Sequence, residues 1–401
     1  MVSAAVYETP AAASGKRIWA IEGLRAWLAW AVVLAHVIQI CGLDRTVNGL
    51  WVTQFLATEA VNVFIIISGF VITSVVIQRQ ESWRRYIVRR AFRIFPVYLL
   101  LLPIGAITML LTIPTLEHMS WAADARFRYD DTAIGTLESV NAAQMAHWIP
   151  HLLLFQGAIP DSTLPFSQTS FLGPAWSLSL EWQFYLIAPA LIWMLRRRFS
   201  SIVAVGTIAV LAVLSRLEVF GHFNLPSFFP AIGYLFLVGI ASRLVFEDLK
   251  RARVYAVAVA VGCLASAALI QPIFAIALWF AFLSLLIIAD RTQGRIEQTV
   301  VRTWSLAFCS KPATALGARS YAVYLVHWPV IQAAAYLLLP LGAFSQWEAF
   351  ALIGASALGS TLILSEVLHR FVERPMIQLG ASLAARAPRR RAMQDRLAEA
   401  P

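Results

Sequence analysis

The sequence has little charge and almost no cysteine. Only 13% of its 401 residues are charged, whereas 59% are hydrophobic, and the mean hydropathy is +0.70. The three cysteines, Cys41, Cys263 and Cys309, fall in different segments and show neither a disulfide framework nor the spacing of a metal site. A soluble protein of this length would not need apolar runs of about 20 residues repeated along the chain. The composition therefore predicts an integral membrane protein and gives no reason to expect a bound metal.

The apolar runs predict an all-α fold, a polytopic membrane bundle of about ten transmembrane helices. To within about three residues at each end, these helices cover 18–41, 58–78, 94–113, 174–195, 201–217, 227–246, 254–271, 273–290, 318–340 and 348–369.

The basic residues predict how the chain is oriented. A net charge of +10 would suit a nucleic-acid partner, but the Lys and Arg residues lie between the hydrophobic runs, where orientation in a bilayer explains them. With the N-terminus in the cytoplasm, 27 of the 32 fall in cytoplasmic segments, and the outer segments hold only Arg45, Arg126, Arg128 and Arg216. This excess predicts two cytoplasmic termini in the cytoplasmic (inner) membrane, with the lipid bilayer as the partner and not nucleic acid.

Three parts of the chain follow from these boundaries. We expect a cytoplasmic leader over 1–17, a transmembrane domain over 18–375 with a long outer loop over 114–173, and a basic cytoplasmic tail over 376–401.

The first helix carries two ionisable residues in an otherwise apolar span. Arg25 and His36 are eleven residues apart, so both lie on one helix face, about 16 Å apart along the axis. A charge inside the membrane costs several kcal/mol unless it faces a polar interior. The pair indicates either a buried polar site or an Arg that reaches the interface beside a His paired inside the bundle.

Two further stretches have open alternatives. Ser68 and Gly69 lie in the middle of the second helix, where they either allow close helix packing or line a substrate path. Five arginines lie in the ten residues 84–93, and Arg90 and Arg93 share a helix face. These arginines serve either a phosphate-bearing ligand or orientation and lipid headgroups.

The later helices carry buried polar groups. Glu181 lies about seven residues inside the helix that begins near 174, so it needs a partner: an ion pair, or a catalytic His that it orients. Pro329 lies two residues after His327, and we expect this proline to kink or break the helix that carries both. We interpret His327 as structural. Glu366 and Arg370 form an i,i+4 pair.

Six motifs occur in order along about residues 18–380. They are Arg25 with His36; Phe64 with Ser68-Gly69-Phe70; Arg90, Arg93-Ile94 and Pro96; Trp176-Ser177-Leu178-Ser179 with Glu181; Ser320-Tyr321, Tyr324-Leu325, His327 and Pro329; and Glu373-Arg374-Pro375. Together they resemble the acyltransferase-3 family of membrane acyltransferases. The resemblance implies transfer of an acyl group, usually acetyl, from acyl-coenzyme A to a hydroxyl of a saccharide, a lipid-linked glycan or another acceptor such as a macrolide. It leaves the acceptor, the acyl chain length and the oligomeric state open.

The resemblance gives the candidate residues roles. His36 is the candidate general base or, instead, the group that takes the acyl group as an acyl-imidazole. Glu181 would orient His36 or bind the acceptor, and Arg25 would hold a coenzyme A phosphate or the thioester oxygen. Arg90, Arg93, Ser68 and Gly69 are the candidate donor-binding residues.

Two other functional classes remain. A transporter or flippase of an envelope glycan or small metabolite could use Arg25, Glu181 and the histidines as a substrate or proton path. A multi-span scaffold with buried ion pairs would leave the arginines of 84–93 without a purpose beyond orientation.

Overall fold

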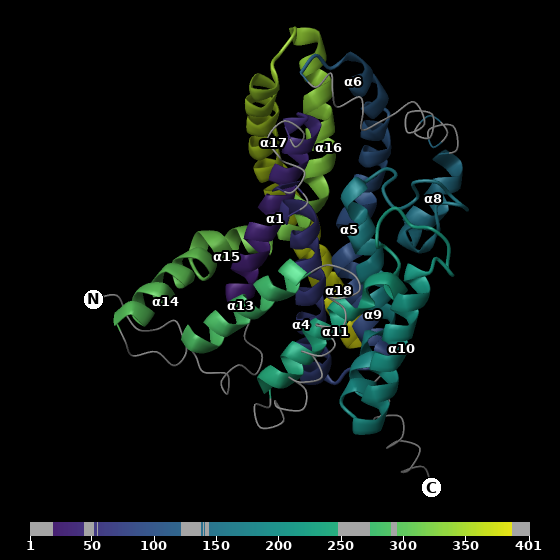
Figure 1. The fold of residues 1–401 in the computed structure, drawn as a ribbon, viewed down its shortest axis with the longest axis vertical. Coiled ribbons are helices and arrows are strands. Elements are labelled where there is room, and N and C mark those ends of the chain that lie inside the picture. The colour runs from purple at the N-terminus through teal and green to yellow at the C-terminus, as the bar shows by residue number, and fades with distance from the viewer. Residues whose placement is uncertain are drawn as a thin grey trace.

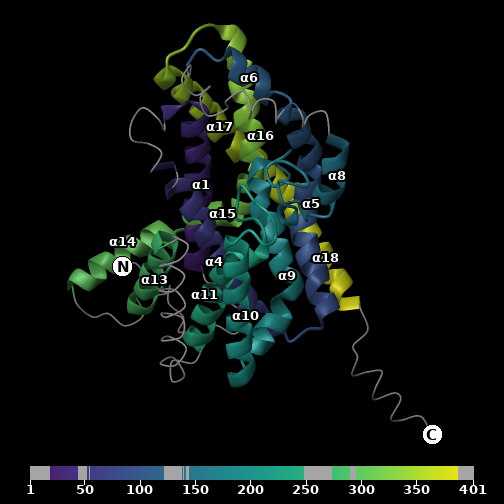
Figure 2. The same ribbon diagram turned by 45° about the vertical axis from the view of Figure 1, so that its right-hand side comes forward.

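The computed structural model describes residues 19–43, 52–53, 55–121, 138, 140, 144–247, 273–289 and 295–386, and regular structure in these residues is helical throughout. Figures 1 and 2 show α1 (Trp19–Ile40), α5 (Trp83–Met109), α16 (Ser320–Leu338) and α17 (Gln346–Leu368) side by side along the long axis. α14 (Arg295–Phe308) extends away from this bundle in both views.

Seven described stretches are helical, long and apolar enough to cross a membrane. They contain the four long helices α1, α5, α16 and α17 together with α4 (Ala60–Arg79), α9 (Trp176–Leu195) and α10 (Arg198–Arg216). α11 (Phe229–Glu247) and α13 (Ile273–Ala289) contain shorter apolar stretches. The described residues also form α6 (Thr112–His118), which ends the same apolar stretch as α5, and α8 (Gln144–Leu152), α15 (Lys311–Ala318) and α18 (Arg374–Arg386). The chain is therefore a polytopic membrane bundle.

Nine of the ten predicted helices have a counterpart among these elements, and the tenth, 254–271, lies outside the described residues. The predicted start of the third helix at 94 is wrong, because α5 begins at Trp83 directly after an extended Ser82. The arginine run thus forms the first part of α5. Pro96 and Pro103 lie inside α5, and α16 likewise continues through Pro329 without a break.

The predicted tail over 376–401 is described only in its first part. Residues 376–386 belong to α18, which packs along α5 (Figure 2), and the rest of the predicted tail lies outside the described residues. The leader over 1–17 lies outside them as well. The outer loop is described over 114–121, at 138 and 140, and over 144–173, and its latter part packs into the bundle: Tyr98 of α5 donates a hydrogen bond to the His151 carbonyl at 2.9 Å.

Glycines allow α4 and α11 to pack closely against each other. A Cβ on Gly69 of α4 would collide with the Phe236 carbonyl of α11, and one on Gly239 of α11 would collide with the Ile66 carbonyl of α4. Glycines permit such close approach between membrane helices, where packing replaces the hydrophobic effect as the driving force. In this structure Gly69 therefore packs against α11.

The outward faces are apolar. On α10 and α17, exposed side chains include Phe199, Ile202, Val210, Leu358 and Ile363. An apolar outer face with satisfied backbone hydrogen bonds is what lipid requires. The polar side chains described next lie instead between α1, α4, α5, α9 and α16.

Candidate functional site

Two cavities lie inside the bundle. The first, here called the arginine cavity, has a volume of about 640 Å³ and is lined by α1, α4, α5, α9, α11, α16 and residues 318, 369, 373, 374 and 377. The second, the histidine cavity, has a volume of about 440 Å³ and is lined mainly by the far ends of α1, α5 and α16 and by residues 166–176. Both volumes are in the range of small-molecule sites.

His36 lines the histidine cavity and is held by His327 of α16. The Nδ1 atom of His36 lies 2.9 Å from Nε2 of His327, and the two rings are inclined by only 12°. The Nδ1 atom of His327 lies 3.1 Å from the Val323 carbonyl oxygen, which can only accept. A neutral His327 therefore donates from Nδ1 and accepts at Nε2, which assigns the donor of the pair to Nδ1–H of His36. In this assignment Nε2 of a neutral His36 keeps a free lone pair.

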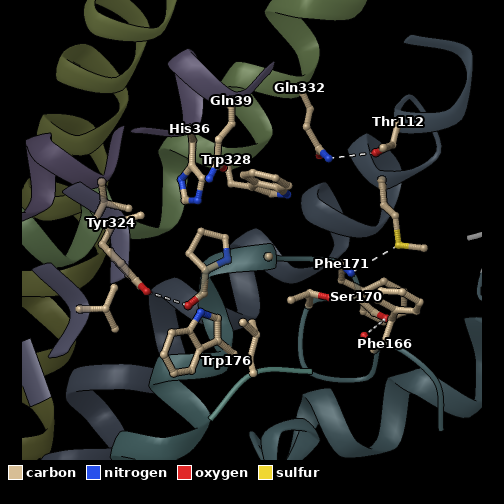
Figure 3. A pocket seen from close by; sticks show the side chains of 18 of the residues that line it. His36, Gln39, Thr112, Phe166, Ser170, Phe171, Trp176, Tyr324, Trp328 and Gln332 are labelled. Atoms are coloured by element: carbon tan, nitrogen blue, oxygen red, sulfur yellow. Dashed lines mark hydrogen bonds between the residues drawn. The ribbon is translucent and has the colours of Figure 1, made fainter. Parts of the chain in front are cut away.

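The rest of the histidine cavity is aromatic and uncharged. Trp328 packs edge-on against His36, with ring centroids 5.0 Å apart. Figure 3 shows Gln332 and Thr112 further along the same wall and Trp176 across the cavity. Among the described residues that line this cavity there is no Asp, Glu, Lys or Arg.

The arginine cavity contains the other candidate residues. Its lining includes Arg25, Arg90 and Arg93 from the predicted set, with Arg79, Arg374, Glu22 and Glu373 beside them. Arg25 lies 3.8 Å from Glu22. The guanidinium of Arg90 lies 5.8 Å from the ring centres of Tyr86 and Tyr185, and its Nε atom is buried without a hydrogen-bond partner among the described residues. A buried cationic donor without a partner is suited to an anionic ligand.

Glu181 also lines the arginine cavity and not the histidine cavity. Its Oε1 atom accepts hydrogen bonds from Ser68 of α4 and from the Tyr185 hydroxyl, the latter at 2.6 Å. The imidazole partner of His36 is thus His327 and not Glu181. Ser68 lines the arginine cavity, whereas its neighbour Gly69 packs against α11.

The two cavities share a wall. Tyr324 and Val61 line both of them. The Tyr324 hydroxyl donates to the Pro174 carbonyl at 2.9 Å and lies 2.8 Å from the Ser177 hydroxyl. Pro174 lines the histidine cavity and Ser177 the arginine cavity, so a single layer of side chains separates the two chambers.

Sequence reasoning missed the partner of His36. The residues of the motif around His327 were visible, but no spacing rule connects His36 with a residue 291 positions away. Gln332 and Trp328 belong to no pattern of charge or spacing, and only the arrangement of α16 shows that they line the cavity.

The sequence is similar to those of known acyltransferases. Residues 18–366 match the family model described as "Acyltransferase domain". The chain is 27% identical over 396 residues to the acyltransferase MdmB of Streptomyces mycarofaciens, covering 90% of this chain and 92% of that protein. It is 24% identical over 401 residues to the peptidoglycan O-acetyltransferase OatA of Listeria monocytogenes, covering 92% of this chain and 57% of that protein. No solved structure matches the chain.

Proposed function

Because the chain belongs to the acyltransferase-3 family, we propose that it transfers an acyl group, expected to be acetyl, from acyl-coenzyme A to a hydroxyl of a saccharide or related acceptor. The observation that carries this proposal is the adjacency of two unlike chambers: one rich in arginine, and one holding an imidazole with a free nitrogen, on either side of Tyr324. The names of MdmB and OatA support an acyl or acetyl group as the group that is transferred.

The arginine cavity is the proposed donor site. Coenzyme A carries several phosphate charges, and guanidinium groups bind phosphate through charge-assisted hydrogen bonds. Arg90 and Arg93 hold the nucleotide end, and the partnerless Nε of Arg90 supports this role. We assign Arg25 to the donor as well, because it faces this cavity and His36 faces the other.

His36 is the proposed general base. Its Nε2 takes the proton of the acceptor hydroxyl as that oxygen attacks the thioester carbonyl carbon, and the imidazolium that forms keeps its Nδ1–H bond to His327. The carbon–sulfur bond then breaks, and the proton on Nε2 passes to the departing sulfur. The same lone pair could accept the acyl group itself, so trapping of an acylated protein without acceptor would distinguish the acyl-imidazole route. In either route Tyr324 has to move out of the shared wall for the thioester to meet His36.

Glu181 has a supporting role in this proposal. Its carboxylate is held by Ser68 and Tyr185 beside the arginines, where it limits the excess positive charge of the empty cavity and orients the phenol of Tyr185. One role predicted for Glu181 is to orient His36. In this proposal His327 orients His36 instead.

The test is transfer by the purified chain in lipid nanodiscs. Labelled acetyl-coenzyme A is supplied with glycans from the producing cells, and labelled products are identified by mass spectrometry. We expect a product whose mass rises by one acetyl group, and its loss in His36→Ala. The matched control is His222→Ala, because His222 is exposed and lies outside both cavities.

Two results would overturn the proposal. Transfer that survives in His36→Ala removes His36 from the base role. Movement of an envelope glycan across vesicles without any acyl transfer favours the transporter, the rival class that the buried ionisable residues also allow.

A further inference from the structure

Gln332 of α16 is a buried amide with one unused oxygen. Its side chain lines the histidine cavity and the residue is only 8% exposed. The Nε2 group donates to Thr112 Oγ1 at 2.9 Å, whereas Oε1 is buried and has no hydrogen-bond partner among the described residues. Buried polar atoms in folded proteins are nearly always satisfied, so an unpartnered one in a cavity wall indicates a ligand that supplies the missing group.

The missing group is a hydrogen-bond donor, and a hydroxyl is the donor that fits. Thr112 Oγ1 accepts from Gln332, so its own hydrogen remains for a ligand oxygen. The pair therefore offers one acceptor, Gln332 Oε1, and one donor, the Thr112 hydroxyl. A ligand hydroxyl both donates and accepts, and it can engage the two atoms together.

The position of this pair places it beside the base. Gln332 follows His327 by five residues, which is about 7.5 Å along a helix axis. Between them, Trp328 packs against His36 and lies close to Gly173, where a Cβ would sit 3.0 Å from the indole. Trp176 lies across the cavity (Figure 3). A sugar ring has apolar C–H faces and a polar rim, so it suits indoles on its faces and the Gln332–Thr112 pair at its rim.

The charge of the cavity excludes one class of ring. The described lining of the histidine cavity has no Lys or Arg that could neutralise an anion, whereas the arginine cavity has five arginines. Moving a carboxylate or phosphate into such a chamber without a counter-charge is strongly unfavourable.

From these four observations we propose that the histidine cavity accepts an uncharged, hydroxyl-bearing ring of the acceptor, and that Gln332 with Thr112 binds a ring hydroxyl other than the one acylated. This inference rests on the proposed function and narrows its substrate class. It also makes Gln332 a determinant of acceptor specificity.

The first test is the identity of the ring that carries the new acetyl group in the mass-spectrometric experiment above. We expect a neutral sugar or another uncharged hydroxylated ring. An acetyl group on a uronic, sialic or phosphorylated ring would overturn the inference while leaving the acyltransferase function in place. Absence of any acetylated product from a folded chain that binds acetyl-coenzyme A would instead overturn the proposed function and this inference with it.

The second test is steady-state kinetics of Gln332→Leu with the acceptor so identified. Loss of one hydrogen bond to the acceptor should raise the acceptor KM about tenfold, whereas the KM for acetyl-coenzyme A should stay unchanged. Gln346→Leu is the matched control, because Gln346 begins α17 and lines neither cavity.

A second variant covers the case in which Gln332→Leu does not fold. Thr112→Val removes the hydroxyl and keeps the side-chain shape, and we expect it to raise the acceptor KM in the same direction. An acceptor KM unchanged in a folded variant that still binds acetyl-coenzyme A would overturn the role of the pair.

Discussion

The proton between His36 and His327 determines which nitrogen of His36 can act as a base. His327 is completely buried, and its Nδ1 lies against a carbonyl oxygen that can only accept. Because Nδ1 of His327 donates to this carbonyl, Nε2 of His327 accepts a hydrogen bond from Nδ1–H of His36. The Nδ1–H group of His36 therefore points to His327 and not into the cavity. The backbone of α16 thus selects the tautomer of a side chain on α1, as a second partner does for many catalytic histidines.

His327 is therefore a positioning residue whose loss should lower kcat and leave binding intact. We expect His327→Ala to reduce kcat about 100-fold, with the KM values for donor and acceptor within about twofold. His327→Gln should recover part of kcat, because an amide oxygen can accept from His36 Nδ1–H. Steady-state kinetics of both variants check this. A purely structural role predicts instead that both variants lose folded protein and that Gln gives no recovery.

Arg90 should act on one end of the donor only. We expect Arg90→Gln to raise the KM for acetyl-coenzyme A by about tenfold or more, since hydrogen bonds to charged groups contribute about 1.5–3 kcal/mol. The KM for acetyl-pantetheine, which lacks the nucleotide phosphates, should stay unchanged. Arg84→Gln is the control, because Arg84 lies in the same run but is exposed and outside the cavity. Equal effects on both donors would contradict the phosphate role.

At the scale of elements, α16 organises the site. It supplies Tyr321, Tyr324, His327, Trp328 and Gln332, so it borders both cavities along one helix. α9 does the same over a shorter distance: Trp176 faces the histidine cavity and Glu181, about 7.5 Å further along the axis, faces the arginine cavity.

The sequence could predict the helices and their polar faces, but not which cavity each polar residue lines. Hydropathy predicts the spans, and helical periodicity puts Arg25 and His36 on one face of the first helix. The same reasoning cannot tell that the two residues face different chambers, because that depends on where Tyr324 of another helix inserts. It also could not separate packing from ligand binding at Ser68 and Gly69, since adjacent helix positions point in different directions and the neighbouring helix decides which one meets the cavity.

The contact between α4 and α11 should be sensitive to a single added side chain. Gly69→Val places atoms where the Phe236 carbonyl lies, so we expect it to destabilise the fold by about 1–3 kcal/mol. Gly206→Val on α10 is the control, because a Cβ there meets nothing within 4 Å. The melting temperatures of the two variants are compared in detergent, with size-exclusion chromatography used to monitor the loss of folded protein. Equal melting temperatures would show that the two helices are not held together at Gly69.

The segment that carries α8 should make stability depend on pH. His151 is buried outside the membrane spans, and burial lowers its pKa to about 4. In the unfolded chain it titrates near the ordinary value of about 6.5, so between these two values the unfolded state binds more protons than the folded state. Stability is therefore complete above pH 6.5 and falls as the pH drops toward 4.

From pH 7.5 to pH 5 this histidine alone should cost about 2 kcal/mol. The neighbouring His147, whose pKa is also lowered by burial, acts in the same direction. Melting temperatures at the two pH values measure the loss, and His151→Gln should reduce it. A variant with the same pH dependence as the parent chain would assign the effect to other groups.

At the scale of the whole molecule, the two chambers lie toward opposite ends of the bundle. The histidine cavity takes Gln39 and Gln332 from the later parts of α1 and α16 and Thr112 from the start of α6. The arginine cavity takes Arg25 from the first part of α1, Arg79 from the end of α4 and Arg374 from α18. In the orientation predicted from the positive charges, the arginine cavity faces the cytoplasm and the histidine cavity faces outward.

That orientation can be tested with two engineered cysteines in a variant without Cys41, Cys263 and Cys309. Ser82→Cys lies between α4 and α5, and Ser345→Cys lies between α16 and α17, and both positions are exposed. We expect a membrane-impermeant maleimide to label Ser345→Cys in intact cells and Ser82→Cys only in inverted vesicles. The reverse pattern would place the arginine cavity on the outside, where coenzyme A is absent, and would refute the donor assignment.

The thin wall at Tyr324 has an electrical consequence. In an energised membrane, the potential falls mainly across the dry layer between two water-filled compartments. With the chambers open to opposite sides as proposed, that layer is reduced to Tyr324, Val61 and their immediate neighbours. The same side chains that the thioester must pass are then the insulator that keeps protons from leaking through the protein, so each turnover has to open the barrier only while the donor itself fills it.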